Sequence, residues 1–259
     1  MTDTINAPEG KETLGIGAII SDTFGIFASN FPLFFALAAL PYFLINLVIL
    51  GMFPALDLND PNAAFTAIAL TAILTSLVFV VVQGVMIRSA VALKTGNGTQ
   101  LNEAVSAALR GFFPILLLGM AYGILMMLGF LALIVPGLIV MAMFSVYIPA
   151  IVFEGKGFGA LQRSSELTKG YRPAIIGALL AVGVMVGIIT SAASMVVAAV
   201  SPGAYAASGQ IANLAGAIAE AIVQGVTAPL SMIVTGLIFV RLREIKEGGA
   251  AEDLVRIFE

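Results

Sequence analysis

The sequence predicts an all-α, polytopic integral membrane protein, and three observations lead to this class. Hydrophobic residues make up 60% of the 259 residues and charged residues only 10%, whereas soluble domains carry about 25% charged residues. Six apolar segments each reach the roughly 20 residues that a helix needs to cross a bilayer. Finally, all 12 Lys and Arg residues fall on one side of the topology that six spans produce.

Four of the six predicted transmembrane helices are separate segments, at residues 31–53, 65–93 and 173–200 and in a stretch that begins between 211 and 220 and ends at 240. The other two share one uncharged stretch, residues 112–153, which has about twice the length of a single span. Pro136 and Gly137 lie near its middle. Because Pro cannot donate the helical hydrogen bond and Gly turns freely, we expect the chain to reverse direction there.

The distribution of Lys and Arg predicts the orientation. With six spans, the connections on the side opposite the termini contain acidic residues, such as Asp57 and Asp60, but no Lys or Arg. Cytoplasmic connections carry an excess of Lys and Arg, so both termini are expected in the cytoplasm. The polar N-terminal segment lacks the basic start and apolar core of a signal peptide, so we expect it to be retained.

A short amphipathic segment precedes the first, third and fifth spans, and each ends near a proline. The residues predicted to share one helical face, opposite the polar residues, are Ile16, Ile20, Phe24 and Phe27 in the first segment, Leu101, Ala104, Val105 and Ala108 in the second, and Leu161, Ser164 and Thr168 in the third. Amphipathic helices of this kind lie in the headgroup plane. We therefore expect three cytoplasmic interfacial helices, the alternative being ordinary loops with chance periodicity.

These segments divide the predicted membrane domain, residues 14–247, into three units at about 14–96, 99–155 and 157–247. Each unit is expected to be an interfacial helix followed by a transmembrane hairpin, and residues 1–13 and 248–259 are expected to be polar tails. The ends of the second and sixth spans also support the repeat, because Gly84, Lys94 and Gly96 recur as Gly236, Lys246 and Gly248 at one constant offset.

Three side-chain amides within the predicted spans are candidate intramembrane polar residues: Asn46, Gln83 and Gln224. An amide in hydrocarbon seeks a hydrogen-bond partner, and bonds between helices are a common solution. These residues therefore either hold helices together or line a polar cavity for a headgroup or small solute. Ionisable groups inside a bilayer are costly, and we expect the nearest candidate, Arg88, to extend along its helix to the cytoplasmic surface.

The connection between the fourth and fifth spans is the most charged of those between spans. Its four cations, Lys156, Arg163, Lys169 and Arg172, outnumber its acidic residues. Near an anionic leaflet each cation contributes on the order of 1 kcal/mol to membrane binding, so these four residues are candidate anionic-lipid contacts. Topology alone would also place cations in a cytoplasmic connection.

The composition excludes several kinds of chemistry. The chain contains no His and no Cys, on which most zinc sites, thiol chemistry and acid–base catalysis near neutral pH depend. The sequence also lacks phosphate-binding loops, nucleophile elbows and dinucleotide-binding motifs. Its net charge of −3 gives no basic excess for nucleic acid. We therefore expect no cofactor, no nucleic-acid partner and no enzymatic activity.

One stretch of about 37 residues, from Pro136 to Arg172, contains a Pro-Gly pair at the start of a span, then Pro149-Ala150, EGKG at 154–157, Arg163-Ser164 and LTKG at 167–170. It resembles the membrane domain of the glycerophosphoryl diester phosphodiesterase family. The resemblance implies a stand-alone six-span member, in the plasma (inner) membrane of a bacterium. Catalysis in that family belongs to a soluble domain that relies on histidines, so the resemblance carries over neither the activity nor any catalytic residue.

Three functions remain open from the sequence. The first is a non-enzymatic accessory or scaffold module that binds membrane lipids or a larger membrane protein complex. The second is a transporter or lipid-handling protein with a cavity lined by Gln83 and Gln224, and a continuous polar cavity that reaches the midplane would favour it. The third, an intramembrane enzyme, ranks below both, because it needs clustered ionisable residues that the spans do not contain.

Overall fold

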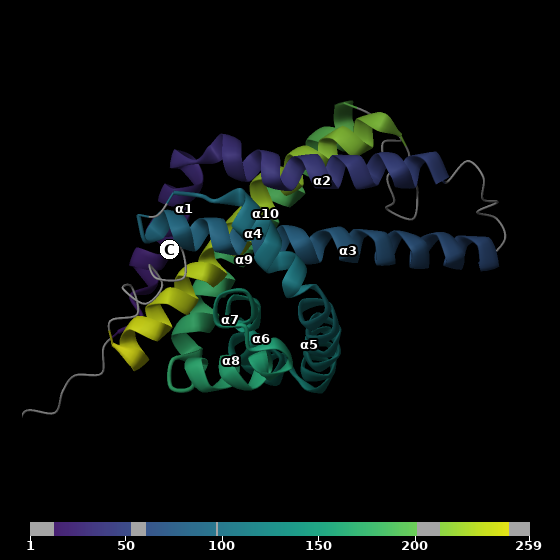
Figure 1. The fold of residues 1–259 in the computed structure, drawn as a ribbon. Helices are drawn as coiled ribbons and strands as arrows, with labels where there is room; N and C mark the ends of the chain where they lie inside the picture. The colour runs from purple at the N-terminus through teal and green to yellow at the C-terminus, as the bar shows by residue number, and fades with distance from the viewer. Residues whose placement is uncertain (1–12, 53–60, 97, 201–212, 249–259) are drawn as a thin grey trace, which may run out of the picture.

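The computed structural model describes residues 13–52, 61–96, 98–200 and 213–248, and the regular structure in these ranges is helical (Figure 1). The helices are α1 (Ile16–Ser29), α2 (Phe31–Met52), α3 (Pro61–Lys94), α4 (Leu101–Arg110), α5 (Phe112–Ala132), α6 (Ile134–Phe144), α7 (Tyr147–Glu154), α8 (Ala160–Thr168), α9 (Arg172–Val200) and α10 (Leu214–Glu247). Nearly all residues of the two predicted polar tails lie outside the described residues.

The six long apolar helices that the sequence predicts are confirmed within the described residues. Segments that are long and apolar enough to cross a membrane occur at Phe31–Met52, Phe65–Lys94, Phe112–Ala132, Ile134–Glu154, Arg172–Ala199 and Leu214–Glu247. Each overlaps one predicted span. The fourth is composed of α6 and α7, so this span contains an interruption.

The reversal between α5 and α6 falls at Leu133, slightly before the predicted Pro136. Leu133 is extended, with φ −175° and ψ 162°. Pro136 then lies in the first turn of α6, where its missing amide costs nothing, because the first amides of a helix have no intrahelical acceptor. A Cβ added to Gly129 would lie 3.0 Å from the Cα of Gly137, so these two glycines allow α5 and α6 to pack closely.

The interruption between α6 and α7 lies at Ser145 and Val146, one turn before Pro149. Pro149 has no amide with which to continue the helical hydrogen bonds. Two hydroxyl groups of α8 satisfy the exposed backbone: Ser164 accepts from the Val146 amide at 3.2 Å and donates to the Met143 carbonyl at 2.9 Å, and Thr168 donates to the same carbonyl at 3.2 Å. The break is therefore bound directly to α8.

The three predicted amphipathic segments form α1, α4 and α8, and each precedes a long apolar helix. In α8 the predicted residues Ser164 and Thr168 are buried. In α4 the predicted face divides, since Ala104 and Ala108 are buried whereas Leu101 and Val105 are exposed. The alanines pack on α3, where only small side chains fit, and the larger residues stay outside. The interfacial position of these helices remains a prediction.

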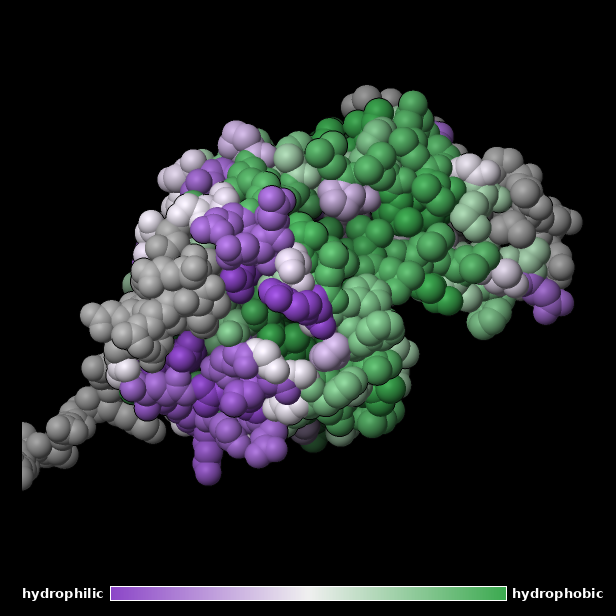
Figure 2. Space-filling view, in the orientation of Figure 1, coloured by the Kyte–Doolittle hydropathy of each residue, from purple (hydrophilic) through white to green (hydrophobic). Residues whose placement is uncertain are grey.

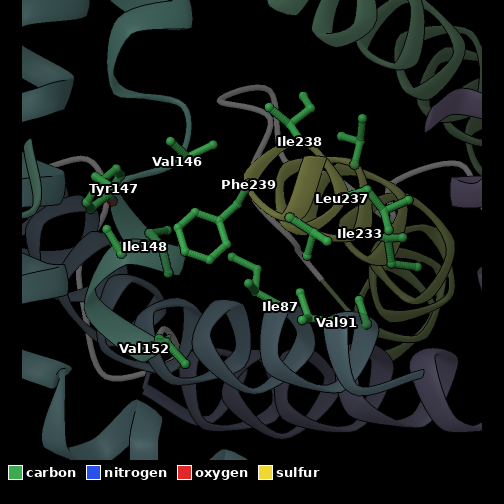
Figure 3. Close-up of a cluster of buried hydrophobic side chains, with 14 of the residues drawn as sticks. Ile87, Val91, Val146, Tyr147, Ile148, Val152, Ile233, Leu237, Ile238 and Phe239 are labelled. Carbon is green, nitrogen blue, oxygen red and sulfur yellow. The ribbon is translucent and has the colours of Figure 1, made fainter. Parts of the chain in front are cut away.

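Helix α10 forms the centre of the core and is the most deeply buried of the six long helices. Figure 3 shows Phe239 of α10 pointing between Ile148 of α7 and Ile87 of α3. Phe239 also stacks on Phe153, with ring centroids 5.8 Å apart. The core thus joins segments that are far apart in sequence.

Polar residues gather at one end of the molecule, as Figure 2 shows, and a hydrophobic surface covers α2 and α3. This end is formed by α1, α4, α8 and the last turns of α3 and α10, and we refer to it as the charged end. An ion pair of 2.6 Å between Lys94 and Asp22 joins α3 to α1 there. The pair of α2 and α3 and the pair of α5 and α6 diverge from each other. In Figure 1, α2 and α3 run across the view, whereas α5 and α6 are seen nearly end-on.

Close packing of α4 on α3 depends on Gly84, and the variant Gly84→Leu is expected to disrupt it. A Cβ at Gly84 would lie 2.8 Å from the Cβ and 3.2 Å from the Cα of Ala108. The Cα and Cβ of Ala108 cannot rotate away as the end of a long side chain could, so we expect a loss of about 1–3 kcal/mol in stability. Thermal unfolding in detergent measures it. Gly123→Leu in α5, where an added Cβ meets nothing within 4 Å, is the control and should unfold no earlier than the wild type.

Candidate functional site

A cavity of about 580 Å³ lies where the helix pairs diverge, bounded by α3, α5, α6, α7, α9 and α10. Apolar side chains make up most of its wall. Its polar groups come from four helices and the α6–α7 break: Ser76 and Gln83, Tyr122, Ser145, Tyr147, Ser231 and Thr235. Aromatic rings form one side, with the centroids of Tyr122 and Tyr147 5.8 Å apart.

The cavity has a buried floor and an exposed rim. At the floor, Ile115 and Val234 are each 1% exposed and Gln83 is 8% exposed. At the rim, Met120 of α5 is 61% exposed, and Ser76 of α3 and Gly183 of α9 are also exposed. The cavity therefore opens at the apolar surface of the long helices, between α3, α5 and α9.

Apart from Ser76 at the rim, the polar groups of the cavity fall into two classes. The hydroxyl groups of Ser145, Ser231 and Thr235 donate to carbonyl oxygens of their own helices, at 2.9, 3.3 and 2.9 Å. By contrast, the side chains of Gln83, Tyr122 and Tyr147 make no hydrogen bond to any residue that the structure describes. A buried amide without a partner is costly. These three residues can bind a polar group of a molecule that enters the cavity.

The other two predicted intramembrane amides do not line this cavity. Asn46 is buried, and its amide donates to the Tyr42 carbonyl at 2.8 Å within α2. Gln224 donates to the Glu220 carboxylate at 2.8 Å within α10. Each of these amides is therefore satisfied by its own helix. The predicted pairing of Gln83 and Gln224 in one cavity does not match this arrangement.

Arg163, one of the four predicted lipid contacts, belongs to an ion-pair cluster of Glu154, Arg163, Arg243 and Glu247. Its guanidinium lies 2.7 Å and 2.8 Å from the two Glu154 oxygens and also binds Glu247. Arg243 lies 3.5 Å from Glu154 and 2.9 Å from Glu247. The bonds to Glu154 raise the pKa of Arg163 above its ordinary value. The cluster ties α7 and α8 to the end of α10.

The other three predicted lipid contacts differ in their surroundings. Lys156 and Lys169 are exposed. Arg172 is half-buried, and its guanidinium donates to the Ser165 hydroxyl at 3.3 Å. The two lysines are therefore the members of the predicted set that best present their charge to a surface outside the protein.

The prediction that Arg88 extends to the surface is wrong. Arg88 is 6% exposed. Its guanidinium lies 3.4 Å from a Glu103 oxygen and over the Phe153 ring, 5.7 Å from the centroid. The sequence contains a signal for this pair, because Glu103 lies on the polar side of the α4 segment, but hydropathy does not reveal that α4 folds over α3.

Part of the chain matches the model of a known protein family. Residues 115–242 match the model of a family described as a domain of unknown function, DUF7847. The matched region begins in the first turns of α5 and ends in α10, so it includes most of the helices that form the cavity. No curated protein and no solved structure matches the chain.

Proposed function

We propose that this protein is a non-enzymatic, lipid-handling integral membrane protein of the plasma membrane that binds an amphipathic lipid in the cavity around Gln83. The observation that carries the proposal is a mostly apolar cavity whose floor holds an amide with no partner among the described residues. Ligand sites are typically apolar with a few placed polar groups. Both termini would be cytoplasmic, as the Lys and Arg distribution indicates.

The position of Gln83 along α3 supports this proposal. Gln83 precedes Lys94, at the charged end, by eleven residues, which is about 16 Å along a helix. The hydrocarbon core of a bilayer is about 30 Å thick. An upright α3 would therefore hold the Gln83 amide near the midplane, where only a ligand or water within the cavity can satisfy it. A lateral opening between α3, α5 and α9 would admit molecules from the bilayer.

A second candidate function, an accessory module of a larger membrane complex, has support from the turn between α5 and α6. Leu131, Leu133 and Ile134 are 80%, 70% and 69% exposed. Outside lipid such a surface would mark a protein contact. Native mass spectrometry after gentle extraction distinguishes the two functions, because the first retains a lipid and the second a stoichiometric protein partner.

The variant Gln83→Leu is expected to bind the retained lipid about fivefold more weakly, because it removes one hydrogen bond of about 1 kcal/mol. The ligand-free protein should become more stable by about 1 kcal/mol, since an amide with no partner among the described residues is replaced by an apolar group of similar size. Lipid retention by native mass spectrometry and thermal unfolding of delipidated protein measure the two effects.

The matched control is Gln224→Leu, the same substitution at an amide outside the cavity. It should leave lipid retention unchanged. If Gln83 instead holds helices together, Gln83→Leu would destabilise the ligand-free protein, and the proposed role in binding would be wrong. Equal lipid retention by both variants would contradict the proposal as well.

A further inference from the structure

A second cavity, of about 500 Å³, lies at the charged end. It is formed by Arg88 of α3, the corner between α4 and α5, the end of α7 and the loop that follows α7. Two of its lining residues carry positive charge, Arg88 and Arg110, and one carries negative charge, Glu154. The surroundings of these three charges decide what the cavity can bind.

The negative charge of Glu154 is neutralised from outside this cavity. Both of its oxygens accept hydrogen bonds from Arg163, and Arg243 lies 3.5 Å away. Neither of these arginines lines the cavity. Glu154 is therefore already shared by two cations outside the cavity, which reduces its ability to compensate Arg88 and Arg110.

The two lining arginines differ in their partners. Arg88 is 6% exposed. It is held between a Glu103 oxygen, at 3.4 Å, and the ring of Phe153. Arg110 is exposed and makes no ion pair with any residue in the described part of the chain. Because both arginines line this one cavity, their positive charges repel each other. An anion between them would remove this repulsion.

The backbone around the cavity also favours an anion. Gly111 and Pro114 place the first turn of α5 on its wall, and a helix N-terminus carries a partial positive charge. In the loop that follows α7, Gly155 and Gly157 also line the cavity, in left-handed conformations with φ 62° and 51°. A Cβ added to either would meet nothing within 4 Å. The loop thus borders the cavity without side chains that would fill it.

We propose that this arginine cavity binds a phosphate-type anion, carried by a lipid headgroup or present as free phosphate. Guanidinium groups recognise phosphate through paired, charge-assisted hydrogen bonds, and Arg88 and Arg110 approach the space from two different helices. Basic pockets between membrane helices bind phosphate headgroups in this way. The inference does not depend on the Gln83 cavity, because no residue lines both cavities.

The test compares the full-length wild type with Arg110→Gln, which removes an exposed charge without leaving a buried partner. Lipid retention is measured by native mass spectrometry after incubation with vesicles of phosphatidylcholine with or without phosphatidylglycerol. Binding of inorganic phosphate is measured as a thermal shift against sodium chloride at equal ionic strength. We expect Arg110→Gln to weaken binding of the recognised probe about tenfold, as loss of a charge-assisted bond implies.

The control is Arg241→Gln, which removes an arginine at the charged end that pairs with Glu244 outside the cavity. It should bind either probe as the wild type does. Selective loss of phosphatidylglycerol in Arg110→Gln supports the site and identifies a lipid source, and selective loss of the phosphate shift supports it and identifies free phosphate. Equal binding by all three proteins, or equal losses in both variants, overturns the proposal.

Discussion

The variant Glu154→Gln is expected to lose about 2 kcal/mol of unfolding free energy, the largest effect on stability that we predict for removal of a charge. Glu154 has a side chain that is 10% exposed, and it binds both Arg163 and Arg243, whose side chains are 21% and 12% exposed. Removing one charge from a buried ion pair costs about 3–5 kcal/mol. We expect less here, because water reaches the cluster and Glu247 still binds both arginines.

Thermal unfolding in detergent measures this loss, and Glu244→Gln provides the matched control. Glu244 pairs with Arg241 within α10, but the two side chains are 35% and 39% exposed. Exposed pairs contribute about 0–1 kcal/mol, so the control should unfold close to the wild type. The double variant Glu154→Gln, Arg163→Gln should recover part of the loss, because it no longer leaves Arg163 without its main partner. Equal unfolding of Glu154→Gln and Glu244→Gln would show that the cluster adds no stability.

The variant Gly183→Leu is expected to lower lipid affinity at least about tenfold, the largest effect on binding that we predict. Gly183 lies on the rim of the Gln83 cavity, and a Cβ added there meets nothing within 4 Å. A leucine would thus extend into the cavity and displace part of a bound chain. Each methylene excluded from an apolar site forfeits about 0.8 kcal/mol, so loss of two methylenes exceeds a tenfold change.

Gly187→Leu is the control, one turn further along α9. An added Cβ at Gly187 also meets nothing within 4 Å, but Gly187 does not line the cavity. Both substitutions replace glycine within the same helix, so the gain in helix propensity is shared and cancels in the comparison. Native mass spectrometry of retained lipid measures the difference. If both variants retained lipid as the wild type does, the bound molecule would lie elsewhere.

The long helices could be predicted because a bilayer-spanning helix requires a long run of apolar residues, which is a local property of the chain. The interruption of the fourth span could not, since Pro149 alone does not determine where a helix breaks. The backbone groups of that break are satisfied by Ser164 and Thr168 of α8, and sequence order gives no indication of this contact.

The candidate site, too, could be predicted from the sequence only in part. The sequence identified three amides in apolar segments, but it could not distinguish Gln83 from Asn46 and Gln224. A side-chain amide that bonds within its own helix and one that faces a cavity both occur in an apolar segment, so the sequence around them looks alike. Only the relative placement of α3, α5, α9 and α10 leaves Gln83 on the floor of the cavity.

Sequence by itself determined the helical class, the six apolar helices and the gathering of Lys and Arg at one side, because hydropathy and charge act residue by residue. Tertiary structure alone decided which charges are satisfied and which polar groups face open space. Arg163 became part of an ion-pair cluster, and Arg88 was buried beside a second cavity. These outcomes depend on contacts between helices far apart in the chain, and such contacts are set by how the side chains pack together.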